Sequence, residues 1–313
     1  MAHTKSTDRI PYRALGRTGV QVPVMGLGGY HLGTIKSKRE AVRIVQAAVD
    51  EGITFMDNAW EYHDGESETL MGKALAEGNR RDEVFLMSKC CSHGRGKETA
   101  LRQLHESLRR LRTDHLDLWQ IHEVVYENDP EKHFGKEGAV EALAEAKRQG
   151  KVRFVGFTGH KDPRLHLKML QHGFPFDTCQ LPLNCFDAAF RSFERQVLPE
   201  LVARGIAPLG MKPICGDGDP AKKRAVKATD ALRYAMSLPV ATTITGIDSM
   251  KVLRQNLAVA RGFTPLAEAE MEALRRQSAE LAADGRFELY KTTAKHEGPV
   301  GRKEHGFPEE REA

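Results

Sequence analysis

Four side chains have the types needed to place a proton on an oxygen atom. Asp57, Lys89 and His122 each end a short apolar run, and Tyr62 follows in the loop after Asp57. An ammonium at the end of an apolar run needs a partner, which Asp57 can supply. A cation near Tyr62 favours the phenolate, so we expect it to lower the pKa of this tyrosine. His122 can orient a substrate oxygen by hydrogen bonding. The group suits an oxygen that gains negative charge, such as a carbonyl that accepts hydride.

A regular fold must bring these side chains together, because they lie far apart in the sequence. An apolar run followed by a helical pattern occurs eight times, in "VMGLG", "ITFMD", "VFLMSK", "LDLWQIH", "VRFVGFTG", "FDTCQL", "IAPLGMK" and "ATTIT". Alternating strands and helices predict a parallel sheet with crossover helices. Eight units favour an α/β fold of the closed (β/α)8 TIM-barrel type. The glycine-rich "GLGGYHLG" has the wrong spacing for a dinucleotide-binding open sheet.

The segments before and after these units extend the barrel. The turn in "YRALGRTGVQV" predicts an N-terminal β-hairpin. We expect one (β/α)8 barrel domain over residues 1–313, with the barrel at about 22–262 and a C-terminal helix and tail at 263–313. Chemistry in such barrels occurs at the carboxyl ends of the strands. The polar strand ends are therefore expected on one rim; they are Asp57, Lys89, His122, Thr158, Gln180 and Lys212.

Composition argues against several classes of protein. The 47 basic and 43 acidic residues give a net charge of +4 and no argument for nucleic-acid binding. The five cysteines form no CxxC pair, which predicts free thiols and a cytoplasmic location. No apolar stretch is long enough for a signal peptide or a membrane span. His63 and Glu61 lack the second ligand pair of a metal site, so no metal is expected.

The chain resembles the aldo-keto reductase family over nearly its whole length. The motifs that carry the resemblance are "GITFMDNAWEYHDGESETLMGKAL", "FLMSK", "LDLWQIH" and "GKVRFVGFTG". The resemblance implies a (β/α)8 barrel that reduces aldehydes or ketones with NADPH, or oxidises alcohols in reverse. It implies that Tyr62 is the general acid and that Lys89, paired with Asp57, lowers its pKa. His122 would position the carbonyl.

The resemblance also implies a site for a nicotinamide cofactor. The family holds the carboxamide with a Ser-Asn pair after the fifth strand and a glutamine in the sixth. The corresponding residues here are Thr158, Gly159 and Gln180, and His160 is a candidate replacement for the missing amide. Met211 stands where many members stack an aromatic ring, followed by Lys212 and Pro213. Lys212 could reach the pyrophosphate as a point charge.

The end of the eighth strand is where the family binds the adenosine 2′-phosphate. The candidate residues are Gly246, Asp248, Ser249, Arg254, Gln255 and Asn256. The usual basic position is Gly246, and Asp248 would repel a 2′-phosphate but accept a hydrogen bond from a 2′-hydroxyl. We therefore expect a weak preference for NADP(H), with NAD(H) also possible.

The substrate is expected to be a small-molecule carbonyl or alcohol. Loop residues placed to contact it are Tyr30, His31, Trp60 and Tyr126. Two other functions remain open: a non-catalytic, nicotinamide-binding regulatory barrel, and a lyase or isomerase in which Lys89 forms a Schiff base. The sequence does not decide the physiological substrate, the direction of reaction or the oligomeric state.

Overall fold

Eight parallel strands of the computed structural model close into a barrel, which confirms the predicted fold class. The structure describes residues 9–91, 96–294 and 297. Strand β10 pairs with both β3 and β9 and thereby closes the barrel. The barrel strands are β3 (Met25–Gly28), β4 (Phe55–Asp57), β5 (Phe85–Cys90), β6 (Leu116–Ile121), β7 (Val152–Thr158), β8 (Thr178–Pro182), β9 (Ala207–Met211) and β10 (Thr242–Gly246).

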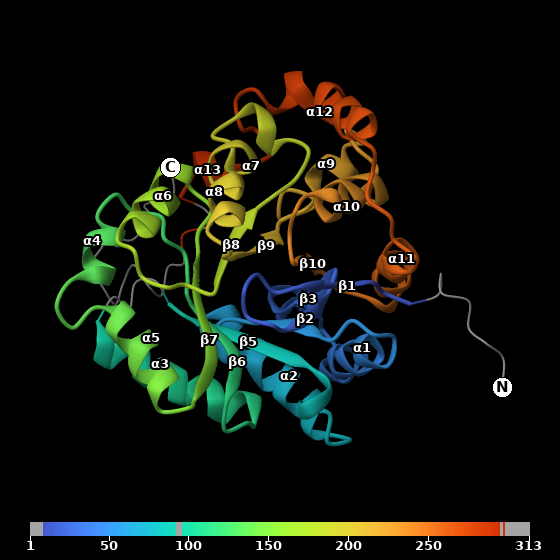
Figure 1. Ribbon diagram of the computed structural model, residues 1–313. Coiled ribbons are helices and arrows are strands. Elements are labelled where there is room, and N and C mark those ends of the chain that lie inside the picture. Colours follow the sequence, from blue (N-terminus) through green and yellow to red (C-terminus); the bar gives the residue numbers. More distant parts are fainter. Residues whose placement is uncertain (1–8, 92–95, 295–296, 298–313) are drawn as a thin grey trace.

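Helices surround the barrel and cover its outer face (Figure 1). In α1 the predicted apolar face is buried, and Ser37 caps the helix by accepting a hydrogen bond from the amide of Glu40. The main crossover helices are α1 (Lys38–Asp50), α2 (Glu66–Ala76), α3 (Lys97–Leu111), α5 (Ala139–Arg148), α6 (Pro163–Gln171), α7 (Phe193–Gln196), α8 (Leu198–Ala203), α10 (Ala228–Ser237) and α11 (Met250–Ala260). Shorter elements are α4 (Asp129–Phe134), α9 (Asp219–Lys222), η2 (Gly29–Thr34), η3 (Tyr62–Gly65), η4 (Arg81–Glu83) and η5 (Asp187–Ala189).

The two-residue period of the strands determines which side chains enter the barrel. Phe55, Phe85 and Leu118 belong to the apolar cluster inside the barrel. Their neighbours Met56 and Leu86 belong to the larger core between strands and helices. Because every second residue faces the same way, Asp57 follows Phe55 into the interior, and Lys89 follows Phe85. The carboxyl ends of the strands therefore carry polar groups above an apolar floor.

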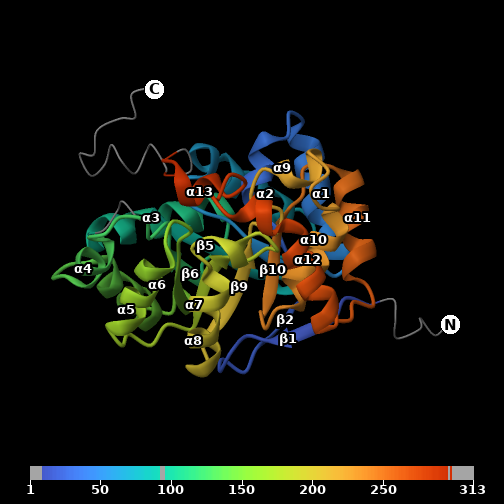
Figure 2. The same ribbon diagram turned by 90° about the horizontal axis from the view of Figure 1, so that it is seen from above.

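The N-terminal hairpin closes the opposite end of the barrel. Strands β1 (Tyr12–Ala14) and β2 (Gln21–Pro23) pair antiparallel, as predicted. Leu15 and Val22 belong to the interior cluster with the floor residues. Figure 2 shows the hairpin at one end of the barrel and α9 and α13 (Leu289–Thr292) at the other. The apolar seal leaves the carboxyl-end rim as the place for chemistry.

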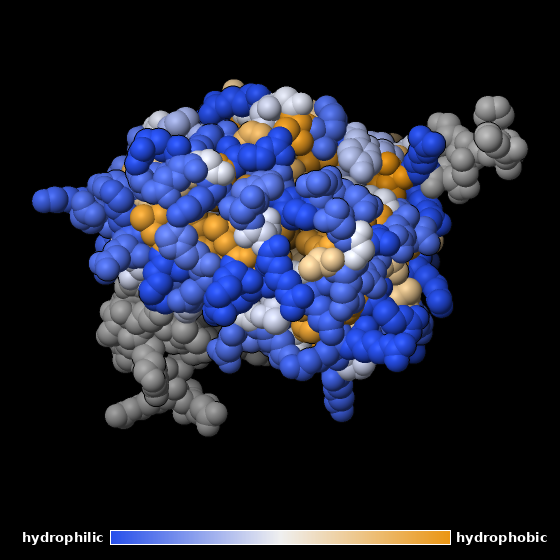
Figure 3. Space-filling model, turned by 90° about the horizontal axis from the view of Figure 1, so that it is seen from below, coloured by the Kyte–Doolittle hydropathy of each residue, from blue (hydrophilic) through white to orange (hydrophobic). Residues whose placement is uncertain are grey.

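Two segments depart from the expected helix pattern. The helix expected near 221–236 is interrupted between α9 and α10, where Arg224 adopts a φ of 59° and the Val226 side chain is buried. The C-terminal region contains α12 (Glu268–Ala282) as well as α13. None of the helices in the described ranges has the length and apolar character needed to cross a bilayer. On the face in Figure 3, apolar residues form small patches among hydrophilic side chains.

Candidate active site

Asp57 and Lys89 form a buried ion pair at the carboxyl ends of neighbouring strands. The Lys89 ammonium donates to Asp57 Oδ1 at 2.6 Å and to the carbonyl oxygen of Asn58 at 2.7 Å. Lys89 is 1% exposed and Asp57 3%. The predicted pairing is confirmed. It meets the requirement that a buried charge be both paired and hydrogen-bonded.

Tyr62 begins η3 and lies above this ion pair. The Lys89 nitrogen is 5.1 Å from the centre of the Tyr62 ring, and the His122 ring meets the tyrosine edge-on at 5.5 Å. Asp57, Lys89, Tyr62 and His122, predicted from separate segments, therefore lie in one group.

The pKa of Tyr62 differs from the expectation. Burial raises it well above its ordinary value, and the carboxylates of Asp57, Glu123 and Glu61 raise it further. The prediction that the pKa of Tyr62 lies below its ordinary value is wrong for this structure. Lys89 directs hydrogens to Asp57 and Asn58, and desolvation of the phenolate dominates. Tyr62 is consequently protonated at neutral pH, which is the form that a proton donor requires.

His122 follows β6 and contacts a carboxylate that sequence reasoning did not connect to it. Its Nδ1 meets Glu61 Oε1 in direct contact, and the Cys91 thiol donates to Glu61 Oε2 at 3.1 Å. On the other side, His122 Nε2 is 4.0 Å from Glu123 Oε1. The signal available in the sequence was the position of Glu61 beside Tyr62. His63, once considered with Glu61, instead contacts the Tyr30 carbonyl through Nε2 at 2.8 Å.

Burial opposes charge on both members of this contact. It raises the pKa of Glu61, and it lowers the pKa of His122 to about 3. Glu61, His122 and Glu123 each bring one atom within 4.8 Å of the others. Such spacing also occurs between metal ligands. Here the Cys91 thiol donates to Glu61 Oε2, whereas Glu61 Oε1 and His122 Nδ1 are in close contact but make no hydrogen bond of ordinary geometry within the described part of the chain.

The fifth and sixth barrel strands supply the predicted carboxamide residues. Gln180 is buried, and its amide nitrogen donates to Asp57 Oδ1 at 3.4 Å while Oε1 has no hydrogen-bond partner among the described residues. Thr158 is buried and donates to the Met211 sulfur at 3.9 Å. A Cβ at Gly159 would lie 2.4 Å from the Val124 carbonyl oxygen, which explains why no amide side chain occupies this position. His160 is buried beside Tyr290, with ring centres 5.8 Å apart.

Lys212 lies nearer the predicted catalytic group than expected. Its ammonium is 5.4 Å from the centre of the Tyr290 ring, and burial lowers its pKa to about 8. The carboxylates of Glu123 and Asp57 oppose that shift. The side chain therefore faces the catalytic rim, beside buried Pro213 and Met211.

The end of β10 gathers most of the predicted adenosine-side residues. Ser249 caps α11 by accepting a hydrogen bond from the amide of Val252 at 3.3 Å. Asn256 is buried, and its amide nitrogen has no hydrogen-bond partner among the described residues. Asp248, Arg254 and Gln255 are exposed.

His31 lies between the two predicted groups, since its ring centre is 5.7 Å from that of Tyr30 and its imidazole also adjoins Gly246. A Cβ at Gly246 would stand 2.3 Å from the His31 ring, so the imidazole covers this glycine. Burial lowers the pKa of His31, and Asp248 opposes the effect.

The remaining predicted substrate residues occupy different positions. Tyr30 is 51% exposed and its ring lies 5.3 Å from the ring of Tyr62. Tyr126 donates to Glu297 Oε2 at 3.1 Å. Trp60 is turned toward α3, where its indole donates to Glu106 Oε2 at 2.7 Å. The indole nitrogen of Trp60 is thus bound to α3, and Tyr30 is the predicted substrate residue whose ring lies beside Tyr62.

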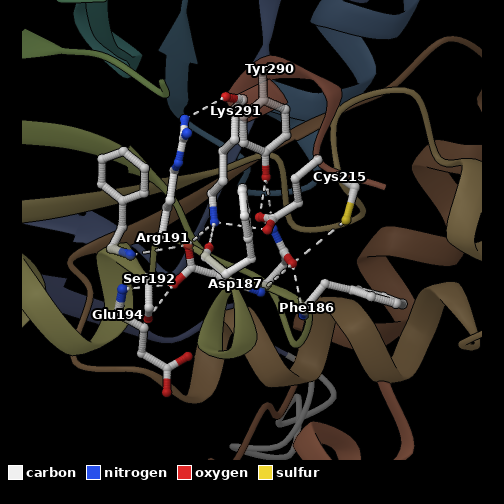
Figure 4. Close-up of polar contacts among 12 residues, drawn as sticks. Phe186, Asp187, Arg191, Ser192, Glu194, Cys215, Tyr290 and Lys291 are labelled. Atoms are coloured by element: carbon white, nitrogen blue, oxygen red, sulfur yellow. Dashed lines mark hydrogen bonds and ion pairs between the residues drawn. The ribbon is translucent and has the colours of Figure 1, made fainter. Parts of the chain in front are cut away.

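A buried polar network, absent from the sequence-based predictions, fixes the C-terminal segment (Figure 4). The Lys291 ammonium donates to Asp187 at 2.7 Å and to Glu288 at 2.8 Å, with all three side chains at most 1% exposed. Tyr290 donates to Glu288 at 2.6 Å. Because Tyr290 also adjoins His160 and Lys212, this segment forms one wall of the rim.

Comparison with known proteins agrees with this geometry. Residues 24–224 match the model of the aldo/keto reductase family. The chain belongs to the aldo-keto reductase family. Among curated members, the aldo-keto reductase YhdN of Bacillus subtilis is 28% identical over 216 residues, which cover 65% of this chain and 62% of YhdN. The L-galactose dehydrogenase of Arabidopsis thaliana is 28% identical over 290 residues, or 80% of this chain and 88% of that protein.

Solved structures of aldo-keto reductases share the fold. The Klebsiella pneumoniae aldo/keto reductase in complex with NADP and acetate superposes with a TM-score of 0.69 at 25% identity, covering 84% of this chain and 94% of that chain. AKR11C1 from Bacillus halodurans gives a TM-score of 0.71 at 23% identity, and the match covers 86% of this chain and 96% of that chain. The chain spans less than two thirds of YhdN, so its own activity is inferred below from its residues.

Proposed function

We propose that this aldo-keto reductase reduces aldehyde, ketone or sugar carbonyls with a nicotinamide cofactor, or oxidises the corresponding alcohols. The observation that carries the proposal is the position of Tyr62 above the buried Lys89–Asp57 pair, with His122 at its edge. A bound cofactor would supply the hydride. The proton acceptor is then an alkoxide, a much stronger base than a phenolate, so Tyr62 can donate despite its raised pKa.

Lys89, Asp57 and His122 assist the proton transfer from Tyr62. The Lys89 cation stabilises negative charge that develops on the Tyr62 oxygen, and Asp57 holds Lys89 in place. His122 Nε2 orients the carbonyl oxygen. Tyr30, exposed and against the Tyr62 ring, lies where a substrate would enter.

Two buried amides fit a nicotinamide cofactor. Gln180 Oε1 and the Asn256 amide nitrogen have no hydrogen-bond partner within the described part of the chain, and buried amides ordinarily have one. Gln180 Oε1 would accept from the carboxamide, and Asn256 would donate on the adenosine side. Thr158, His160, Met211, Lys212 and Pro213 would complete the nicotinamide end, and Gly246, Asp248, Ser249, Arg254 and Gln255 the adenosine end.

The preference between the two cofactors is proposed to be weak and in favour of NADP(H). Arg254 is exposed on α11 and can reach a phosphate, whereas Asp248 would repel one. These opposing charges make NAD(H) an acceptable second cofactor.

The Schiff-base alternative receives no support from the contacts of Lys89. A lysine nucleophile must lose a proton and reach a carbonyl carbon. Lys89 is 1% exposed and donates to both a carboxylate and a backbone carbonyl, which favours the charged ammonium.

The test is a titration of the purified protein with NADPH and NADH, followed by a panel of aryl aldehydes, ketones and sugars with the tighter cofactor. We expect saturable binding of at least one nucleotide and carbonyl-dependent oxidation of it. Binding without turnover on any carbonyl or alcohol would favour the regulatory-barrel alternative.

A further inference from the structure

The contact between Glu61 and His122 determines which imidazole nitrogen faces the site. Glu61 Oε1 touches Nδ1, so Nε2 is the nitrogen directed away from Glu61, toward Glu123 at 4.0 Å. The contact is shielded from solvent, since the His122 and Glu61 side chains are 8% and 9% exposed. A carboxylate against one ring nitrogen of a histidine sets the tautomer of the ring.

We propose that Glu61 is a positioning residue that shares a proton with His122 Nδ1 and thereby controls whether Nε2 carries a hydrogen for the carbonyl oxygen. This inference rests on the proposed function only in its last step, the oxygen that Nε2 meets. The tautomer itself is a property of the protein alone.

The pair has two relevant protonation states. With two protons, one lies between Glu61 and Nδ1 and the other is on Nε2, which can then donate to an oxygen. With one proton, the carboxylate retains it on Nδ1, and Nε2 presents a lone pair that repels a carbonyl oxygen. Carbonyl reduction therefore requires the two-proton state, which is the state favoured at lower pH.

Burial favours the two-proton state over the one-proton state. It raises the pKa of Glu61 and lowers the pKa of His122, so the neutral carboxyl beside a neutral imidazole is favoured over a lone buried anion. Among the residues that the structure describes, the other titratable or charged groups facing the pair are Asp57, Tyr62, Lys89, Cys90, Cys91, Glu123 and Lys212. They include two cations and two acidic side chains of opposite sign, so their effects partly cancel.

Cys91 makes a Glu61→Gln variant unusually informative. Its thiol donates to Oε2, and its amide is held by the Gln103 side chain at 2.8 Å. In the variant the thiol will retain the amide oxygen, which directs the amide nitrogen toward Nδ1. An N–H donor at Nδ1 fixes the neutral imidazole as the Nε2–H tautomer at every pH above its own pKa. The substitution should therefore lock His122 in its donating form.

The first experiment compares pH profiles of kcat/KM for carbonyl reduction. When the profiles are recorded over about pH 5 to 9, the wild-type rate should fall about tenfold per pH unit above the apparent pKa of the pair. The Glu61→Gln variant should not show this decrease at high pH, which we call the limb of the profile, and its kcat/KM should vary by no more than about threefold over the same pH range. Burial keeps the pKa of Tyr62 well above 10, so its ionisation lies outside the range. The matched control is Asp64→Asn, a carboxylate-to-amide change at an exposed residue of the same turn, which should keep the wild-type limb.

A second variant keeps the proposal testable if Glu61→Gln does not fold. Cys91→Ala removes a donor that stabilises the Glu61 anion, so the limb should move to higher pH by about half a unit or more. A flat wild-type profile, an unchanged limb in Glu61→Gln, or an equal loss at every pH would each overturn the inference.

The second experiment needs no turnover. Imidazole ¹⁵N NMR, with the His122 signals identified by their loss in His122→Gln, reports which nitrogen is protonated. At about pH 9 we expect Nδ1–H in the wild-type protein and Nε2–H in Glu61→Gln. Nε2–H in the wild-type protein at this pH would overturn the inference. Absence of turnover together with the expected tautomers would instead reject the proposed function and retain the Glu61 assignment.

Discussion

Replacing Lys89 by methionine should destabilise the fold by an amount that depends on pH. Lys89 is the ammonium partner of Asp57 and also donates to the Asn58 carbonyl; both acceptors are buried. Methionine preserves most of the side-chain volume but no donor. Gln180 would still donate to Asp57 Oδ1, at 3.4 Å. Loss of one member of a buried pair costs about 3–5 kcal/mol.

The folded variant can reduce this destabilisation if the unpaired Asp57 carboxylate binds a proton. For an aspartate of ordinary acidity, near 3.9, protonation costs about 4 kcal/mol at pH 7 but only about 1.5 kcal/mol at pH 5. At pH values above about 3.9 the aspartate ionises freely in the unfolded chain but not when it is buried without its partner. The loss in free energy of unfolding of the variant, relative to wild type, therefore grows as pH rises. At about 2 °C per kcal/mol, Tm should fall by roughly 8 °C at pH 7 and roughly 3 °C at pH 5.

The assay is thermal unfolding followed by circular dichroism, on wild-type, Lys89→Met and the double variant Asp57→Asn/Lys89→Met. The double variant has no buried charge, so it should recover most of the loss at pH 7 and show little difference between the two pH values. Equal destabilisation by Lys89→Met at both pH values, or no recovery in the double variant, would refute the assignment of a buried, paired Asp57.

Three other substitutions test separate parts of the structure. Asp248→Ala should improve binding of NADPH relative to NADH in a fluorescence titration, because it removes a charge that repels a 2′-phosphate; an unchanged ratio would dismiss that role. Burial lowers the pKa of His166 to about 4, below about 6.5 for an unfolded histidine, so its stabilisation is present above pH 6.5 and is lost as pH falls toward 4. His166→Leu should remove up to about 3 kcal/mol of this acid sensitivity in urea unfolding, and an unchanged dependence would contradict the buried neutral imidazole. Lys291→Met should lower stability by about 3–5 kcal/mol by leaving Asp187 and Glu288 unpaired, whereas a neutral effect would contradict the network.

The sequence predicted the barrel because its signals are local and repeated. Each strand is an apolar run, and each polar residue at a run's end must lie on the same rim, which brings Asp57, Lys89 and His122 together. The ion pair followed from the cost of an unpaired ammonium. These inferences need only the order of elements along the chain.

Side-chain orientation in the loops could not be predicted in the same way. Trp60 lies next to the predicted catalytic group in sequence, yet it turns to α3 because Glu106 accepts its indole hydrogen. Glu61 follows β4 and His122 follows β6, so their contact forms only when the barrel has folded. The pKa of Tyr62 depends on desolvation, which no spacing encodes. The C-terminal network likewise joins Lys291 to Asp187 over a separation of 104 residues.

Single-turnover oxidation of bound NADPH by a reactive aldehyde tests the central claim most directly, when wild-type protein is compared with Tyr62→Phe. Phenylalanine retains the ring that packs against His122 and removes only the hydroxyl. We predict a rate lower by at least about a hundredfold, the usual contribution of a general acid, with the NADPH dissociation constant unchanged. An undiminished rate in Tyr62→Phe would show that the proton comes from elsewhere.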